Sequence, residues 1–391
     1  MKSGGKGADS LQIEAEKLKA KLDNGDDLFI LDVRTPAEHA AWKLSYDRYV
    51  ETSVIPFEKF SGSSDQIANQ IPKDKEIVTL CAHGMRSQMA AQMLSKMGYN
   101  VKSIKGGMAA WNQVYDVAEL PPSNATNDPR VWQLRRVSKG CMAYVISSGK
   151  SATVIDSTCD LDSSVLRLAE ENSLKIVNVI DTHMHADHVS GLSTLAKKTG
   201  AKAYVGAKEG YEPSSDVKVT KLDDGHVLSL GKGVSITIIH TPGHTEGSLC
   251  FGLSTGKKGY LFTGDTLFVN GVGRPDLHSK ATEYATNLYN TYHEILLKFP
   301  DDTVILPAHF DISSITVKHG ELIMETIGSV KRKNKLLSMP QDEFVEFMVS
   351  TVPPRPANYE KIVQINKKLM RCDQIKMGDL EEGPNSCAIR M

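Results

Sequence analysis

The stretch "DTHMHADH", residues 181–188, places four side chains that can bind a metal within a few positions of one another. They are His183, His185, Asp187 and His188. The stretch directly follows "KIVNVI", an apolar run with the length of a buried strand. Packing alone gives no reason to gather such residues at a strand end, because buried polar groups are costly unless they find partners. The stretch therefore predicts a metal site at the edge of a sheet.

Three later segments carry further metal donors in the same position relative to an apolar run. His244 lies in "TPGHTEGS", Asp265 in "LFTGDTLF" and His309 in "ILPAHF". Imidazole and carboxylate groups from separate strand ends are the ligands that a mononuclear or a binuclear metal site requires. We expect these strand ends to meet at one edge of a sheet.

This ordered set of motifs resembles the metallo-β-lactamase fold, a sandwich of two sheets flanked by helices. The resemblance extends over roughly residues 131–372. It implies, for binuclear members, one metal held by His183, His185 and His244. It implies a second metal held by Asp187, His188 and His309, with Asp265 as the bridge.

The segment "FTGDTLFVNGVGRPDL", residues 262–277, is similar to the persulfide dioxygenase branch of that fold. This resemblance implies one Fe(II) per chain, bound by His183, His244 and Asp265, with positions left open for a substrate sulfur and O₂. The remaining donors would then orient these ligands and exclude a second ion; they are His185, Asp187, His188 and His309.

Arg274, in the same segment, has two possible roles. It is a candidate for binding the carboxylate or the thiol-carrier part of the substrate. Alternatively, it forms a salt bridge to Asp276 that braces the loop. The sequence leaves both roles open.

A second chemical motif, "LCAHGMRSQ", occupies residues 80–88. Cys81 follows a predicted strand and Arg86 begins a predicted helix, and such strand-to-helix turns bind ligands in parallel sheets. Backbone N–H groups of a tight loop favour a thiolate, which is the nucleophilic form of cysteine. For Cys81 taken alone, a buried structural cysteine is the simpler interpretation.

The complete loop resembles the active loop of rhodanese sulfurtransferases. The segments "LDVRTPAEH" (31–39) and "GGMAAW" (106–111) also match that family in order, and the resemblance covers roughly residues 10–115. It implies transfer of a sulfane sulfur through a persulfide on Cys81, with Arg86 binding an anion such as thiosulfate. Three further residues of the motif are expected to brace the fold: Asp32, Arg34 and Glu38.

These motifs predict an α/β domain followed by an α+β domain. We expect a small parallel-sheet rhodanese-like domain at 10–115, a linker at 116–130 and an αββα metallo-β-lactamase sandwich at 131–372. The tail, 373–391, is expected to be disordered because it holds glycines and a proline and ends the chain.

Composition limits the class of protein. With 46 basic and 47 acidic residues, the chain lacks the basic excess of a nucleic-acid binder. No apolar stretch approaches the length of a membrane span, and the N-terminus lacks the apolar core of a signal peptide. The 6 cysteines are scattered, which suits a reducing cytoplasm better than a disulfide framework. Oligomeric state stays open, a homo-oligomer included.

The predicted function is sulfur oxidation. A low-molecular-weight thiol persulfide, similar to that of glutathione, would be oxidised by O₂ to sulfite, and the rhodanese-like domain would exchange sulfane sulfur with thiosulfate or sulfite. One alternative is a thioester hydrolase of the glyoxalase II type with two Zn²⁺ ions, since all the donors of a binuclear site are present. Another is a sulfur-carrier or sensor protein in which the second domain only docks a partner.

Overall fold

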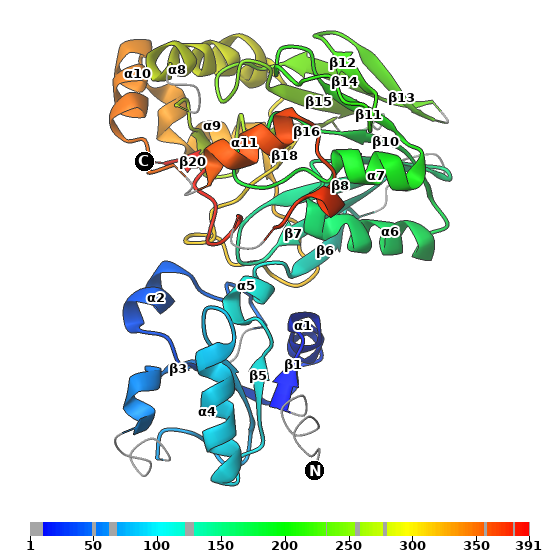
Figure 1. Cartoon of the computed structure of the whole chain (residues 1–391). Coiled ribbons are helices and arrows are strands. Elements are labelled where there is room, and N and C mark those ends of the chain that lie inside the picture. The colour runs from blue at the N-terminus through cyan, green and yellow to red at the C-terminus, as the bar shows by residue number, and fades with distance from the viewer. Residues whose placement is uncertain are drawn as a thin grey trace.

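The computed structural model describes residues 11–48, 52–61, 69–121, 129–231, 233–254, 259–276, 280–355, 358–377 and 380–390. Two domains follow each other along the chain, the first drawn in blue and cyan and the second from teal through green to red (Figure 1). The predicted combination of a parallel-sheet domain and a two-sheet sandwich is confirmed.

The first domain contains a parallel sheet with the strand order β1-β5-β4-β2-β3. Strand β2 is buried along its whole length because helices cover both faces, as is usual for parallel sheets. Its strands are β1 (Gln12–Ile13), β2 (Leu28–Asp32), β3 (Thr52–Val54), β4 (Glu76–Leu80) and β5 (Val101–Ile104). Within its described residues the α-helices are α1 (Ala15–Asp23), α2 (Pro36–Ala41), α4 (Met85–Lys96) and α5 (Gly107–Trp111).

The second domain is built from two sheets packed face to face. The larger sheet has the order β12-β11-β10-β9-β8-β7-β6, and the other has the order β13-β14-β15-β16-β18-β19. The strands of the larger sheet are β6 (Tyr115–Glu119), β7 (Arg130–Arg136), β8 (Met142–Ser148), β9 (Ser151–Ile155), β10 (Lys175–Ile180), β11 (Lys202–Gly206) and β12 (Val219–Leu222). Those of the other are β13 (Val227–Gly231), β14 (Val234–His240), β15 (Leu249–Ser254), β16 (Gly259–Gly264), β18 (Val304–Pro307) and β19 (Glu325–Thr326).

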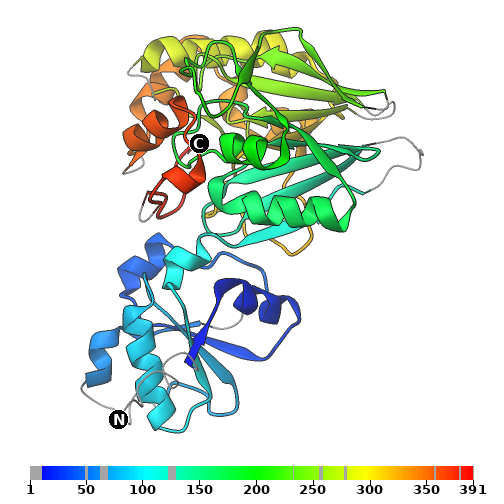
Figure 2. The same cartoon turned by 45° about the vertical axis from the view of Figure 1, so that its right-hand side comes forward.

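Helices cover the outer faces of this sandwich (Figures 1 and 2). Helices α6 (Asp162–Glu171) and α7 (Leu192–Thr199) share a buried apolar cluster with the larger sheet. The outer face of the other sheet packs against α8 (Ala281–Asn290), α9 (Ile327–Lys333) and α10 (Gln341–Ser350). Helix α11 (Tyr359–Lys367) lies near the C-terminus. Within the described residues, none of the helices is both long enough and apolar enough to span a membrane.

The predicted linker at 116–130 is wrong in its first part. Strand β6, Tyr115–Glu119, pairs antiparallel with β7 and forms an edge of the larger sheet of the second domain. Alternation of buried and exposed side chains along "YDVAE" suits a strand at a sheet edge. Residues 122–128 lie outside the described part of the chain.

The two domains are in direct contact around Asp116, a buried residue of β6. Its carboxylate accepts hydrogen bonds from Lys19 of the first domain and pairs with His319 of the second, at 2.8 and 2.7 Å. Nearby, the Trp42 indole N–H donates to the Ser138 carbonyl at 3.0 Å. One buried apolar cluster continues from the interior of the sandwich into the first domain. The linker predicted at 116–130 therefore does not separate the two domains, which pack directly against each other.

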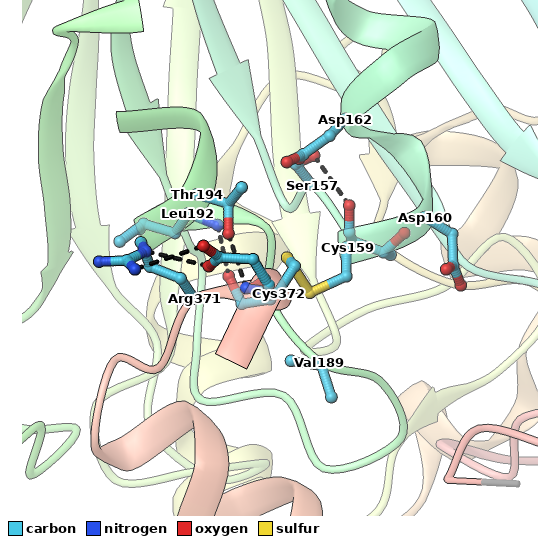
Figure 3. Close-up of a disulfide and its surroundings, with 12 residues drawn as sticks. Ser157, Cys159, Asp160, Asp162, Val189, Leu192, Thr194, Arg371 and Cys372 are labelled. Atoms are coloured by element: carbon cyan, nitrogen blue, oxygen red, sulfur yellow. Dashed lines mark hydrogen bonds and ion pairs between the residues drawn. A yellow bond between two sulfur atoms is a disulfide. The ribbon is translucent and has the colours of Figure 1, made fainter. Parts of the chain in front are cut away.

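A disulfide joins Cys159 to Cys372, with their Cα atoms 5.6 Å apart (Figure 3). It links the loop after β9 to the 3₁₀ turn at Cys372–Gln374, and the Cys372 N–H also donates to Thr194 Oγ1 at 2.8 Å. The scattered cysteines predicted no disulfide framework, and this pair departs from that expectation because the two partners are 213 residues apart in sequence.

The prediction of a disordered tail is also wrong for its described residues. Residues 380–390, which we call the C-terminal segment, include strand β20 (Ala388–Ile389), and this strand pairs with β17 (Val272–Gly273). The segment is held because its backbone and side chains find specific partners: Asn385 Nδ2, for example, donates to the carbonyls of Lys139 and Phe310. Residues 378–379 and 391 lie outside the described part.

Candidate metal centre and cysteine loop

The predicted metal donors meet at one edge of the sandwich, as expected. The cluster at 183–188 follows β10, His244 follows β14, Asp265 follows β16 and His309 follows β18. All of these side chains are buried. The side-chain amide of Asn366 holds the loop that carries the cluster at 183–188. Its Nδ2 donates to the carbonyls of His185 and His188 at 2.9 Å each.

His183, His244 and Asp265 form a compact triad of donors. The Nε2 atoms of both histidines lie 3.6 Å from Asp265 Oδ2, and the ligand atoms of the triad all lie within 4.8 Å of one another. Asp265 Oδ2 is fully buried and has no hydrogen-bond partner among the described residues. Because an unpaired buried carboxylate oxygen is costly, a cation between these three atoms fits the site.

Neighbouring groups orient the two triad histidines. His244 Nδ1 lies 2.9 Å from the Arg274 carbonyl, which can only accept, so Nδ1 carries the proton and Nε2 is left free to bind a metal. His183 Nδ1 lies 2.9 Å from Thr182 Oγ1. Burial lowers the pKa of His183 and of His244 below the ordinary value, which favours the neutral imidazole that metal binding needs.

His309 has a different environment, because both of its ring nitrogens face carboxylates. Nδ1 lies 2.6 Å from Asp265 Oδ1, and Nε2 lies 2.9 Å from Asp187 Oδ2. Burial would lower the pKa of His309, but Asp187 and Asp265 hold it well above the ordinary value. In this arrangement His309 connects two carboxylates, and one of them belongs to the triad.

The His185 ring lies next to that of His183 in the triad, with the ring centroids 4.2 Å apart, and its Nδ1 atom is buried without a hydrogen-bond partner among the described residues. Its Nε2 atom lies 3.2 Å from Asp156 Oδ1, and it forms a separate group with Asp156 and Asp181. His188 instead pairs with its neighbour Asp187, Nδ1 to Oδ1, at 3.0 Å. The three histidines outside the triad therefore all have carboxylate partners, and Asp187 is the partner of two of them.

Two thiols that the sequence motifs do not predict lie beside the metal donors. Cys141 Sγ lies 3.2 Å from Asp187 Oδ2 and shares a donor group with Asp187, His188 and His309. Cys387 forms a further group with Asp265 and His309. No local pattern marks these cysteines, since each reaches the site only through the long-range fold.

The environment of Arg274 favours the bracing role over substrate binding. The side chain is 1% exposed, and every guanidinium nitrogen donates to a protein oxygen. Nε and Nη2 bind the two carboxylate oxygens of Asp276 at 2.7 and 3.0 Å, while Nη1 donates to the Ser386 carbonyl at 3.0 Å and Nη2 to the Pro353 carbonyl at 2.6 Å. Arg274 thus ties its loop to the C-terminal segment and contributes to the site through its own carbonyl.

We expect Arg274→Lys to lower the free energy of unfolding by about 3 kcal/mol, because an ammonium group cannot make the forked contacts of a buried guanidinium. Thermal unfolding would measure this loss. Arg355→Lys is the matched control, since Arg355 also binds Asp276 but is partly exposed, and its effect should be smaller. An unchanged melting temperature with a raised KM for the substrate would instead indicate a substrate clamp.

The cysteine loop lies between β4 and α4, as predicted. The Gly84 N–H donates to Cys81 Sγ at 3.1 Å, and Ser87 Oγ lies 3.3 Å from the same sulfur. Gly84 is the N-cap residue of α4 and has a φ of 90°, which favours glycine. Gly107 packs so closely that a Cβ there would lie 2.2 Å from the Cys81 carbonyl oxygen. The "GGMAAW" segment therefore packs directly against the cysteine loop.

Arg86 lies beside this loop and forms an ion pair with Glu38, Nη2 to Oε1, at 2.5 Å. The hydrogen bond from Arg86 lowers the pKa of Glu38 to about 2. Glu38 also completes the N-terminal capping box of α2 with Thr35. Asp32 and Arg34 form a buried salt bridge at 2.7 Å, the geometry expected of residues that brace the fold.

Family models match both parts of the chain. A model of the rhodanese-like domain matches residues 14–114, and a model of the metallo-beta-lactamase superfamily matches residues 138–309.

Curated relatives include enzymes and uncharacterised proteins. Human mitochondrial persulfide dioxygenase ETHE1 is 29% identical over 57% of this chain and 80% of its own length. An uncharacterised protein of Mycobacterium leprae is 31% identical over 45% of this chain and 88% of its own length. A hydroxyacylglutathione hydrolase of a Polaromonas species is 35% identical, over 37% of this chain and 52% of its own length.

Two solved structures share the fold at 28% identity. A metallo-beta-lactamase from Staphylococcus aureus superposes with a TM-score of 0.56, covering 63% of this chain and 74% of that protein. ETHE1 from Myxococcus xanthus superposes with a TM-score of 0.52, covering 60% of this chain and 96% of that protein. The chain therefore carries a domain of the metallo-beta-lactamase superfamily, preceded by a rhodanese-like domain.

Proposed function

We propose that this protein is an iron-dependent persulfide dioxygenase with a sulfurtransferase domain. Its substrate would be the persulfide of a low-molecular-weight thiol such as glutathione. In the balanced reaction, the persulfide, O₂ and water yield the thiol, sulfite and two protons. The similarity to ETHE1 proteins of two organisms supports the reaction class.

The observation that carries the proposal is the triad of His183, His244 and Asp265. Two imidazoles and one carboxylate form the donor set typical of non-haem Fe(II) oxygenases. When bound, Fe(II) would supply the redox chemistry towards O₂ that Zn²⁺ lacks, together with open positions for ligands. The protein holds the two histidine Nε2 atoms and Asp265 Oδ2 in convergence, and the Arg274 carbonyl fixes the His244 tautomer.

Residues around the triad would favour a single ion. His309 binds both Asp265 and Asp187 and is thereby engaged on both ring nitrogens, while His185 is turned towards Asp156. In this role the surrounding residues hold the triad carboxylate in place and keep the site dry.

In the first domain we propose that Cys81 carries a sulfane sulfur as a persulfide. Thiosulfate would transfer its outer sulfur to the Cys81 thiolate and leave as sulfite, and the same step in reverse would produce thiosulfate. The Gly84 N–H, which points at the sulfur, would stabilise the anion, and Arg86 would attract the substrate.

A binuclear zinc thioester hydrolase remains the second candidate. The donor group of Cys141, Asp187, His188 and His309 favours it, because His188 Nε2 is buried without a hydrogen-bond partner among the described residues. The similarity to a hydroxyacylglutathione hydrolase points the same way.

Metal content and oxygen uptake of the purified protein distinguish the two functions. The dioxygenase predicts a single iron ion per chain, O₂ consumption with glutathione persulfide, and sulfite as the product. A thioester of glutathione serves as the second substrate in a parallel assay. Two zinc ions per chain, with thioester cleavage and no oxygen uptake, would assign the protein to the hydrolases.

A further inference from the structure

The C-terminal segment brings a thiol to the metal donors. Cys387 is 5% exposed, and its Sγ atom lies within 4.8 Å of ligand atoms of Asp265 and His309. In Figures 1 and 2 the red end of the chain lies against the second domain. The proposed roles of the triad and of the surrounding histidines assign no function to this cysteine.

The position of Cys387 is held by contacts on both sides of the residue. Its carbonyl accepts a hydrogen bond from the Arg274 backbone N–H at 3.0 Å, and the preceding Ser386 carbonyl accepts from the Arg274 guanidinium. The following residues pair with β17 through Val272 and Gly273. Because Arg274 also orients His244 through its carbonyl, one residue sets the placement of the thiol and of a metal donor.

A second observation at the same place points to a ligand. Asp265 Oδ2 is buried and without a hydrogen-bond partner among the described residues, so the donors beside Cys387 are arranged for an additional group. Cys250, another buried thiol, has a different environment: it packs in the apolar cluster of the outer helices and contacts Thr241 Oγ1 at 3.3 Å.

The same segment also contacts the cysteine loop of the first domain. Glu382 Oε1 lies 2.6 Å from Nε2 of His83, two residues after Cys81, and the Glu381 carbonyl accepts from Asn112 at 3.0 Å. Cys387 lies five positions after Glu382, a chain length of at most ~18 Å. A pocket of about 300 Å³ lies between α5 and this segment, lined by Gly106, Asn112 and Glu382 among others.

We propose that Cys387 receives the sulfane sulfur and carries it, as a protein persulfide, at the metal centre. This inference rests on the proposed dioxygenase function and names the group that presents its substrate. In the transfer, a bond forms between Cys387 Sγ and the terminal sulfur of the donor persulfide, and the donor's own S–S bond breaks. The Cys387 proton passes to the departing thiolate, so nothing is oxidised or reduced.

The length of the S–S bond in a Cys387 persulfide is compatible with delivery of the terminal sulfur to the metal centre. An S–S bond is about 2.0 Å long, so the terminal sulfur of a Cys387 persulfide can lie closer to the triad than Sγ itself. Two donors share the necessary chemistry: the Cys81 persulfide of the same chain, and a free low-molecular-weight persulfide.

Sulfur labelling of the metal-free protein in the absence of O₂ tests the proposal and separates the two donors. One sample receives thiosulfate labelled in its outer sulfur, and another receives labelled glutathione persulfide. After alkylation and trypsin digestion, mass spectrometry follows the peptides 76–86 and 377–390, which contain Cys81 and Cys387. We expect labelled sulfur on Cys387 in the wild-type protein with at least one donor.

Cys81→Ser identifies the donor. If this variant loses the Cys387 label with thiosulfate but keeps it with glutathione persulfide, sulfur reaches Cys387 from both sources. Absence of label on Cys387 with either donor in the wild-type protein would overturn the proposal, and this readout does not depend on metal or turnover.

A matched pair of variants then tests the role of the thiol in turnover. Cys387→Ser should bind the same amount of iron as the wild type but lose oxygen uptake on glutathione persulfide by more than about tenfold, because a hydroxyl cannot carry the sulfur. Cys250→Ser should retain both. Full oxygen uptake by Cys387→Ser would refute the carrier role while the dioxygenase assignment stands, whereas a wild-type protein without iron or oxygen uptake would refute the dioxygenase.

Discussion

Replacing His183 or Asp265 by alanine is expected to remove the bound iron and abolish oxygen uptake with a thiol persulfide. Each substitution deletes one of the three convergent donors, and the remaining two cannot hold Fe(II) in the geometry that oxygen chemistry needs. Asp265→Ala also removes a partner of His309. Metal analysis of the purified variants, together with an oxygen electrode, measures both losses.

His309→Ala should keep most of its iron, with an affinity reduced by about 10- to 100-fold at most, because it acts on the triad only through Asp265. His226→Ala, an exposed histidine in the loop before β13, is the neutral control. If His309→Ala lost as much metal as His183→Ala, His309 would be a direct ligand, and the single-ion model of the site would have to be replaced by a binuclear one.

Cys81→Ser should abolish sulfur transfer from thiosulfate and leave oxygen uptake on a supplied persulfide largely intact. Serine preserves the size of the side chain and the contact with the Gly84 N–H, but it cannot form a persulfide. Thiosulfate-dependent transfer to cyanide measures the first activity, and oxygen uptake measures the second.

Met85→Ala offers a control for this loop, since the Met85 side chain is 74% exposed beside the nucleophile. It should keep both activities close to those of the wild type. Loss of oxygen uptake on supplied persulfide in Cys81→Ser would show that the metal centre accepts sulfur only through the first domain.

The sequence was sufficient to predict the metal donors because each of them lies at the end of an apolar run. The ends of neighbouring strands in a sheet lie at the same edge. The position of each residue at a strand end therefore already predicted that His183, His244 and Asp265 lie close together. The cysteine loop was predictable for a similar reason, since a strand, a tight turn and a helix follow within a few residues.

The remaining features depend on contacts between residues far apart in the chain. Cys387 reaches the metal donors because β20 pairs with β17, more than a hundred residues earlier in sequence, and no periodicity marks a two-residue strand. The partner of Cys159 and the buried bonds of Arg274 are likewise determined by tertiary placement. In "YDVAE" the alternation that marks a strand was present, but the prolines and turn-forming residues after it favoured a linker.

The pairing of β6 with β7 also determines where the chain can be cut to separate the two domains or to exchange one of them. The family model of the rhodanese-like domain ends at residue 114, and the next residue, Tyr115, already belongs to the sheet of its neighbour. A breakpoint within the proline-containing stretch after β6 would leave that strand on the wrong fragment and uncover the backbone N–H and C=O groups of β7, an edge prone to self-association. The boundary at which these two modules can be exchanged therefore lies before Tyr115, at the junction of helix α5 and strand β6.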